Sequence, residues 1–361
     1  MDDLVENTIR ITRSLKKRPF ATTEPTLQKP GTKKRVPLGD ITNSADGGST
    51  QSSGLVGTHK PKPNPKKAEK EKEPARPKTV SGSDDGEKFE DAALVYQNLQ
   101  ASEVEEKRRP LPDYMAKVQK DVNQAMREIL LDWLVEVAEE YKLVSDTLYL
   151  TVSYIDRFLS QHSVSRNKLQ LVGVSSMLVA AKYEEISPPH VEDFCYMTDN
   201  TYTKEEVLNM ERDVLIFLNH DMGTPTIKTF MRIFTRGTQE NCKVLNLELE
   251  FLGSYLAELG SLDYECLQFF PSMVAASAIF LSRLTIQPTM HPWGLALQHY
   301  SGYRPSELKE CVHAIQDLQL GMRGSALQAV RYKYMQHKFK CVAALSSPSE
   351  IPASYFEDCK A

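Results

Sequence analysis

The sequence lacks the features of several protein classes. No apolar run approaches the roughly 20 residues that a membrane-spanning helix needs. The N-terminus is basic but has no apolar segment of the kind found in a secretory signal. The six cysteines stand at positions 195, 242, 266, 311, 341 and 359, and none forms a CxxC pair. This spacing indicates neither a zinc site nor a disulfide framework, so we expect a reducing intracellular compartment.

Motifs for catalysis are also missing. The chain has no Gly-rich phosphate-binding loop, no His-Arg-Asp or Asp-Phe-Gly kinase motif and no cluster of metal-ligating residues. We therefore expect a protein that is not an enzyme, binds no metal and needs no cofactor.

The charge is divided unevenly along the 361 residues. Residues 1–90 hold 18 Lys and Arg against 13 Asp and Glu, whereas the remainder holds 26 against 35. A basic tail on an acidic body is compatible with nucleic-acid contact. It is more typical of a tail that carries targeting and processing signals, so we expect no direct nucleic-acid partner.

Residues 1–90 are rich in Lys, Pro, Ser, Thr and Gly and poor in large apolar residues. Such a segment buries too little surface to offset the entropy of ordering, which predicts a long disordered tail. Two basic clusters, Lys16-Lys17-Arg18 and Lys33-Lys34-Arg35, are candidate nuclear-import signals. We expect a nuclear protein with a cytoplasmic pool.

One motif in this tail is more specific. Arg35, Leu38, Ile41 and Asn43 form the pattern RxxLxxIxN. The pattern resembles a destruction box, a degron that a ubiquitin ligase binds as an extended peptide. A bare RxxL is frequent by chance, but the full spacing favours the degron.

Apolar residues at helical spacing predict an all-α body. Residues 91–108 favour a helix that the prolines at 110 and 112 end, and a short helix follows around Tyr114 to Lys120, with Asp113 as its N-cap. Five helices come next: 126–141, one after the capping residues Ser145 and Asp146, 168–186, 190–197, and one that opens with the capping box Thr203-Lys204-Glu205-Glu206.

The pattern then recurs at an offset of roughly 100 residues, longer than a solenoid repeat. Residues 272–279 resemble 175–180, and residues 301–308 echo 200–207. We therefore predict two tandem five-helix domains. The charged end of the helix over 168–186 is not copied, because Arg283, the counterpart of Lys182, is followed by no acid.

The helix over 126–141 has a wide apolar face and an acidic stripe at Glu128, Asp132, Glu136 and Glu140. The plain interpretation is a solvated stripe beside a core face. The alternative is a groove in which apolar side chains seat a ligand side chain while Glu136 receives a cation.

In this order and spacing, MREILLDWLVEV, YIDRFL, KLQLVG, AAKYEEISPP and YTKEEVLNMERDVL resemble the cyclin box of A-type cyclins, most closely those of plants. The resemblance covers residues 91–345. It implies two tandem cyclin folds with an N-terminal helix, over 91–223 and 224–345, between the tail of residues 1–90 and a C-terminal tail over 346–361.

The resemblance implies a subunit that binds and activates a cyclin-dependent serine/threonine kinase of the PSTAIRE type. Lys182 would cap carbonyls at the end of the PSTAIRE helix, and Glu211 would accept hydrogen bonds from the kinase backbone. An ordinary helix-end lysine is the plain alternative for Lys182, and Glu184 and Glu185 are equally compatible with solvation of the helix end. The implied kinase-binding set is Lys182, Tyr183, Glu184, Glu185, Ile186, Glu211 and Met222.

The resemblance also implies a groove for Arg-x-Leu motifs of substrates and inhibitors, and an internal salt bridge between Arg127 and Asp156. Glu128 departs from the usual MRAIL motif; it either favours basic peptides or points to solvent. The implied groove consists of Met126, Ile129, Trp133, Glu136, Leu169 and Gln170.

The expected mechanism is allosteric: the chain binds the active arrangement of the kinase preferentially and controls progression through S phase and G2/M. Two alternatives come from other classes, a helical scaffold that does not activate a kinase and a transcription-associated cyclin-fold protein. A promoter-binding cyclin fold would need a basic body, and this body is acidic.

Overall fold

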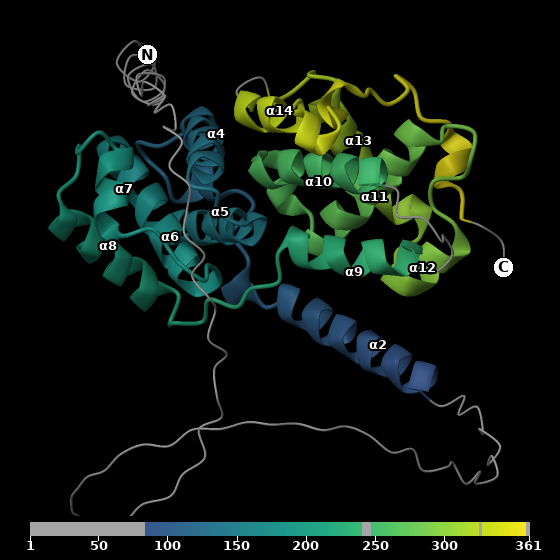
Figure 1. Cartoon of the computed structure of the whole chain (residues 1–361), viewed down its shortest axis with the longest axis horizontal. Helices are drawn as coiled ribbons and strands as arrows, with labels where there is room; N and C mark the ends of the chain where they lie inside the picture. The colour runs from purple at the N-terminus through teal and green to yellow at the C-terminus, as the bar shows by residue number, and fades with distance from the viewer. Residues whose placement is uncertain (1–83, 240–246, 325–326, 359–361) are drawn as a thin grey trace, which may run out of the picture. The chain divides into compact units, whose positions relative to one another are not determined.

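The computed structural model describes residues 84–239, 247–324 and 327–358, and in these ranges all regular structure is helical (Figure 1). The longer helices are α2 (Asp84–Glu103), α4 (Gln124–Glu140), α5 (Ser145–Leu159), α6 (Leu169–Glu184), α8 (Lys204–Phe217), α9 (Ile227–Gln239), α10 (Leu247–Leu262), α11 (Pro271–Ile286) and α13 (Pro305–Gln319). The short ones are α3 (Tyr114–Lys117), α7 (Val191–Met197), α12 (Leu295–Ser301) and α14 (Gln328–Tyr334). The 3-10 turns are η1 (Glu106–Arg108), η2 (Arg166–Lys168), η3 (Glu265–Gln268), η4 (His337–Phe339), η5 (Val342–Ala344) and η6 (Ala353–Phe356).

The predicted all-α class and the two tandem five-helix folds are confirmed. In the first fold, α4, α5, α7 and α8 pack around α6, and in the second, α9, α10 and α13 pack around α11. Both central helices are 16 residues long and bury small side chains between larger apolar ones. Residues 1–83 of the predicted disordered tail lie outside the described residues, and the predicted boundary at residue 90 was wrong, because residues 84–90 belong to α2.

Close packing of the first fold depends on Gly173 in α6. A Cβ atom at this position would lie 2.8 Å from Cδ1 of Leu130 in α4, closer than two carbon atoms approach. The glycine therefore lets α6 lie directly against α4, and this contact sets the spacing of the side chains that the two helices share.

The N-terminal helix α2 is attached to the second fold. The Tyr96 hydroxyl donates to the carbonyl of Ser301 at 2.7 Å, and its ring meets Phe230 and Phe234 edge-on. At the other end, the Glu103 carboxylate accepts from both the backbone N–H and the hydroxyl of Ser272, at the start of α11. The predicted helix over 91–108 therefore differs at both ends: α2 begins earlier, at Asp84, and ends earlier, at Glu103, before the chain turns into η1.

The two folds are joined by polar contacts as well as by apolar packing. Asp132 of α4 accepts from the backbone N–H of Ala329 at 2.8 Å and so caps α14. Burial raises the pKa of this carboxyl from 3.8 to about 7, against the effect of that hydrogen bond and with a contribution from Glu136. The acidic stripe predicted for this helix is therefore partly structural, since one of its members holds the second fold.

The raised pKa gives a signed prediction for Asp132→Asn. The folded state holds its proton up to a higher pH than the unfolded state does, so the stabilisation is complete below about pH 4 and is lost as the pH rises toward about 7. Asparagine keeps an acceptor for Ala329 but does not ionise. We expect the free energy of unfolding of the native chain, relative to the variant, to fall by at least about 1 kcal/mol between pH 5 and pH 8. Urea unfolding at both pH values measures this difference, and parallel pH profiles would contradict the assignment.

Candidate functional site

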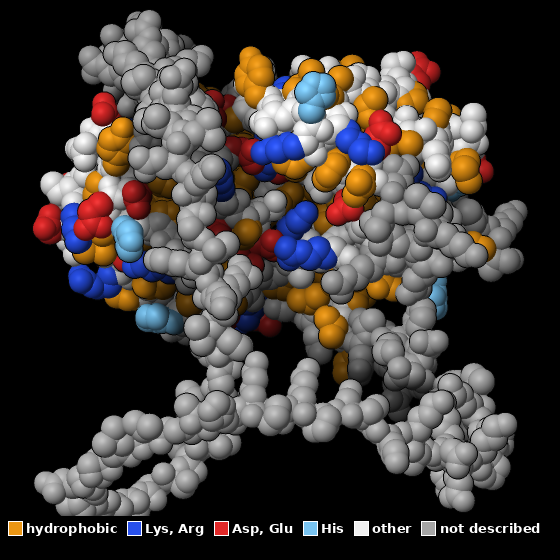
Figure 2. Space-filling model, in the orientation of Figure 1, with side chains coloured by type: hydrophobic (Ala, Val, Ile, Leu, Met, Phe, Trp, Pro, Cys, Tyr) orange, Lys and Arg blue, Asp and Glu red, His pale blue; other side chains and the backbone are white. Residues whose placement is uncertain are grey.

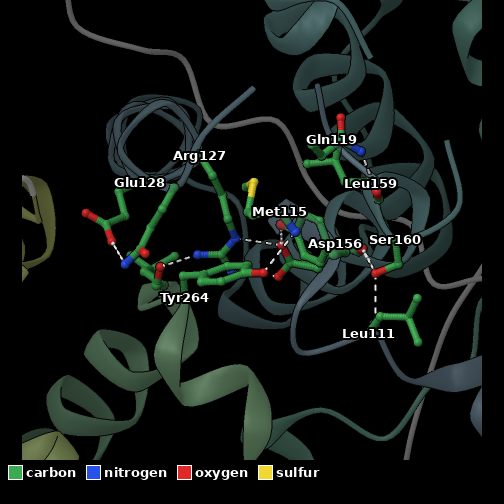
Figure 3. A network of polar contacts seen from close by, with 12 residues as sticks. Leu111, Met115, Gln119, Arg127, Glu128, Asp156, Leu159, Ser160 and Tyr264 are labelled. Atoms are coloured by element: carbon green, nitrogen blue, oxygen red, sulfur yellow. Dashed lines mark hydrogen bonds and ion pairs between the residues drawn. The ribbon is translucent and has the colours of Figure 1, made fainter. Parts of the chain in front are cut away.

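A buried ion pair between Arg127 of α4 and Asp156 of α5 joins the first two long helices of the first fold (Figure 3). Nε and Nη2 of Arg127 donate to the two carboxylate oxygens of Asp156, at 2.6 and 2.7 Å. The third donor, Nη1, bonds the carbonyl of Leu262 in the second fold at 2.5 Å, and Tyr114 donates to Asp156 at 2.8 Å. Burial opposes the charge on Arg127, but the carboxylate outweighs it and raises the pKa of the guanidinium. The sequence-predicted partners therefore lie together, and their network reaches both folds.

The segment that leads into α4 is fixed by the same region. Gln119 donates to the carbonyls of Leu159 and His162, and its own carbonyl accepts from the N–H of Val164. The Leu111 N–H bonds Ser160, directly after α5. These bonds set the position from which α4 begins.

The first turn of α4 has a cap that our sequence reasoning missed. The side chain of Asn123 accepts from the N–H of Met126 at 3.0 Å. An Asn directly before an apolar helix is an N-cap signal, so the pattern was present. Glu128 is half-buried and accepts from Gln124 at 3.0 Å, which makes it part of the helix surface rather than a free acid.

Lys182 and Glu211 meet at one edge of the first fold. Lys182 occupies the last turn of α6, and its Nζ lies 2.5 Å from Oε1 of Glu211 in α8. The lysine side chain is 49% exposed and that of Glu211 only 10%. The carboxylate thus holds the ammonium in place while leaving much of it accessible.

Apolar side chains stand beside this pair. Tyr183 is half exposed, and Ile186 is 106% exposed, as open as in an extended peptide. Met222 is half-buried, and its carbonyl accepts from the hydroxyl of Tyr154 at 2.9 Å. A Cβ at Gly223 would lie 3.1 Å from the Tyr183 hydroxyl, which places this ring against the chain that leaves the first fold. The edge therefore combines a held cation with uncovered apolar surface.

The two acids in this segment differ. Glu185 accepts from the N–H of Val144 at 2.8 Å and from the Thr147 hydroxyl at 2.7 Å, at the start of α5. It supplies the cap that we expected from Ser145 and Asp146; that expectation was wrong, because the N-cap is Val144 and Asp146 pairs with Arg232 of α9. Glu184 is exposed. The partial burial of its carboxyl and the nearby charge of Asp146 raise its pKa.

The predicted docking residues lie where α4 and α6 pack together. Trp133 and Leu169 are buried, and the other four are half-buried. Two of the six carry an unsatisfied donor: within the described residues, Nε1 of Trp133 and Nε2 of Gln170 are buried without a hydrogen-bond partner. A buried donor without an acceptor costs about 1–3 kcal/mol.

The remaining sequence predictions concern the tail motifs, metal-ligating groups and membrane-spanning helices. The degron-like residues Arg35, Leu38, Ile41 and Asn43, and both basic clusters, lie outside the described residues. Within the described ranges, no group of three metal-ligating side chains comes together and none of the helices is long and apolar enough to cross a membrane. Acidic and basic side chains are interspersed on the face shown in Figure 2.

Comparisons with known proteins match both folds to family models. Residues 95–223 match the family model of the cyclin N-terminal domain, and residues 225–348 match that of the cyclin C-terminal domain. The chain is 61% identical over 267 residues to cyclin-A3-1 of Oryza sativa subsp. japonica, covering 74% of this chain and 72% of that protein. It is 50% identical over 340 residues to the G2/mitotic-specific cyclin C13-1 of Daucus carota, covering 92% and 98%.

A solved structure, the viral cyclin of herpesvirus saimiri, is similar in fold. The TM-score is 0.56 at 21% identity, and the match covers 64% of this chain and 99% of the viral one. At this identity the likeness concerns the arrangement of helices alone.

The buried ion pair gives a prediction about stability. Asp156→Asn leaves the Arg127 charge buried without its counter-charge, and we expect a loss of about 3–5 kcal/mol in the free energy of unfolding. Arg127→Met combined with Asp156→Asn removes the unpaired charge and is expected to be less destabilising than Asp156→Asn alone. Urea unfolding of the full chain measures both values. A single variant that costs under about 1 kcal/mol, or a double variant that costs the sum of its parts, would contradict this account.

Proposed function

The chain belongs to the cyclin family, among the A3-type cyclins of plants, and we propose that it binds and activates a cyclin-dependent serine/threonine kinase through the edge that holds Lys182 and Glu211. Cyclins of this type are regulators of the cell cycle. We propose a regulatory subunit that supplies no catalytic group, so that ATP binding and phosphoryl transfer belong to the kinase.

The observation that carries this proposal is the pairing of an accessible Lys182 with a buried Glu211. A cation fixed at the rim of a fold suits the carbonyl end of a partner helix, where the helix dipole favours positive charge. The second carboxylate oxygen of Glu211 remains to accept from a partner N–H. A lysine held only for the stability of its own fold would need no uncovered apolar neighbours.

Ile186 and Tyr183 supply the apolar part of the contact. Covering an exposed isoleucine removes its surface from water, which contributes to association. Around it, Lys182 and Glu211 set the register of the partner helix. By binding the active arrangement better, the chain shifts the kinase toward the state in which its helix glutamate meets the ATP-binding lysine.

We propose that the groove between α4 and α6 recruits Arg-x-Leu segments of substrates and inhibitors. The ligand leucine would enter the slot lined by Met126, Ile129 and Trp133, and its arginine would meet Glu136. Glu136 supports this proposal, because it is a half-buried carboxylate on the same helix as Met126, Ile129 and Trp133.

Reconstitution with a purified PSTAIRE-type cyclin-dependent kinase tests the kinase-binding edge. Lys182→Ala with Glu211→Ala removes both charges, so neither is left buried and unpaired. We expect histone phosphorylation that the native chain stimulates strongly and the double variant at least tenfold less.

Met126→Ala with Gln170→Ala serves as the matched control, since it alters the groove and leaves the edge intact. It is expected to retain stimulation toward histone and to lose it, at least fivefold, toward a substrate with an Arg-x-Leu segment. Binding without stimulation would favour the alternative of a non-activating scaffold. Full stimulation by the edge variant would keep the function and refute the site, and no binding to such kinases would refute the function.

We further propose that the tail carries a degron read by a ubiquitin ligase and signals for nuclear import. Arg35→Ala with Leu38→Ala removes two residues of the RxxLxxIxN pattern. We expect the tagged double variant to persist after mitosis in synchronised cells, whereas the native chain is cleared. Equal half-lives would refute the degron, and exclusion of the tagged native chain from nuclei would refute nuclear import.

A further inference from the structure

The full sequence contains three serine or threonine residues that precede proline, the acceptor pattern of proline-directed kinases. They are Ser187, Thr224 and Ser347. Thr224 is half-buried and accepts from Arg157 at 2.9 Å. Ser347 is buried, and the carbonyl of the following Pro348 is bound by Gln316. Ser187 alone of the three is exposed, and its hydroxyl has no partner within the described residues.

The backbone around Ser187 also suits an acceptor site. The N–H of Glu185 makes the last bond of α6, and α7 starts only at Val191. Pro188 and Pro189 have no N–H, and the helical conformation is disfavoured for Ser187 because it precedes a proline, so the chain bends at Ile186 and Ser187 instead of continuing α6. Ser187 therefore lies in the loop between α6 and α7, and no helical hydrogen bond has to break for a kinase to bind it.

We propose that Ser187 is a phosphorylation site for a proline-directed serine/threonine kinase, and that its phosphate prevents the partner kinase from docking. This inference rests on the proposed function of the neighbouring edge. Ser187 directly follows Ile186, the most exposed apolar side chain of that edge, and stands five residues after Lys182.

The charge at this place explains the expected effect. A phosphoserine carries about −1.5 to −2 charges at neutral pH. It would stand beyond the C-terminal end of α6, where the helix dipole disfavours an anion, and close in sequence to Glu184 and Glu185. Docking over Ile186 would have to strip water from the phosphate. If the phosphate instead paired with Lys182, it would withdraw that ammonium from the partner helix.

The position of Ser187 beside Ile186 also determines when it can be phosphorylated. A partner that covers Ile186 covers the adjoining Ser187, so the modification acts on the free chain and is blocked in the complex. Phosphorylation and kinase binding are therefore mutually exclusive, and the site controls assembly rather than the activity of an assembled complex.

The test uses the full chain and a purified, active mitogen-activated kinase as the proline-directed probe. We expect mass spectrometry to place phosphate on Ser187 and not on Thr224 or Ser347, and Ser187→Ala to abolish this incorporation. Prior assembly with a catalytically inactive PSTAIRE-type kinase is expected to reduce incorporation at least tenfold. The phosphorylated chain is expected to bind that kinase at least tenfold more weakly than the unmodified chain, while Ser187→Ala treated identically binds normally.

The outcomes separate this proposal from the proposed function. Normal binding by the unmodified chain, together with absent incorporation at Ser187, equal incorporation in the complex or unchanged binding after phosphorylation, overturns the Ser187 proposal alone. Failure of the unmodified chain to bind such kinases overturns the proposed function, and with it the role assigned to the phosphate.

Discussion

The packing of the two cyclin folds against each other depends on the Arg127–Asp156 ion pair. A guanidinium taken out of water is costly unless each of its directions is satisfied. Here two directions are met by one carboxylate and the third by the Leu262 carbonyl of the second fold. The hydroxyl of Tyr114, in the segment before α4, donates to one of the same carboxylate oxygens. Separation of the folds would expose this network to partial loss, so it favours one arrangement of the two over others.

Helix α4 shows how one element serves three surfaces. Arg127 bonds Leu262 at the junction, Met126 and Trp133 belong to the proposed groove, and Asp132 caps α14 of the second fold. Helical spacing of 3.6 residues per turn distributes these neighbours to different directions. The groove is therefore attached to the junction through the backbone of a single helix, and its position follows from the ion pair.

Helix α6 connects the two proposed binding surfaces. Leu169 and Gln170 open it beside the groove, and Lys182 closes it at the kinase-binding edge. Lys182 lies 13 residues after Leu169, so at a rise of 1.5 Å per residue the two surfaces are roughly 20 Å apart along the helix. Because this helix is buried along most of its length, the separation is fixed. A docked substrate segment and a bound kinase would thus be held at a set distance, which favours presentation of the same substrate to the same kinase.

The sequence predicted what depends on near neighbours. Helical periodicity placed α4, α6 and α7 to within a few residues, and the capping box at Thr203 and Glu206 is present in the structure, whereas α2 begins well before its predicted start. The prediction failed where a distant residue took over a local role. Asp146 was expected to cap its own helix, but Arg232 claims it across the junction, and Glu185 supplies the cap instead. Nothing in the local pattern distinguishes an acid that caps its own helix from one that pairs across a junction.

The duplicated architecture explains where binding chemistry lies. The two central helices have the same length and the same mixture of small and apolar side chains, so packing alone accounts for what they share. They differ at their ends: α6 runs into Lys182, Tyr183 and an exposed Ile186, whereas α11 ends at Ile286 without an acidic segment. In the second fold, the buried Lys333 bonds Glu258 at 2.9 Å, so this charge is paired inside the protein. A repeated core therefore supplies the framework, and the residues by which the first copy departs from the second form the proposed contact surface.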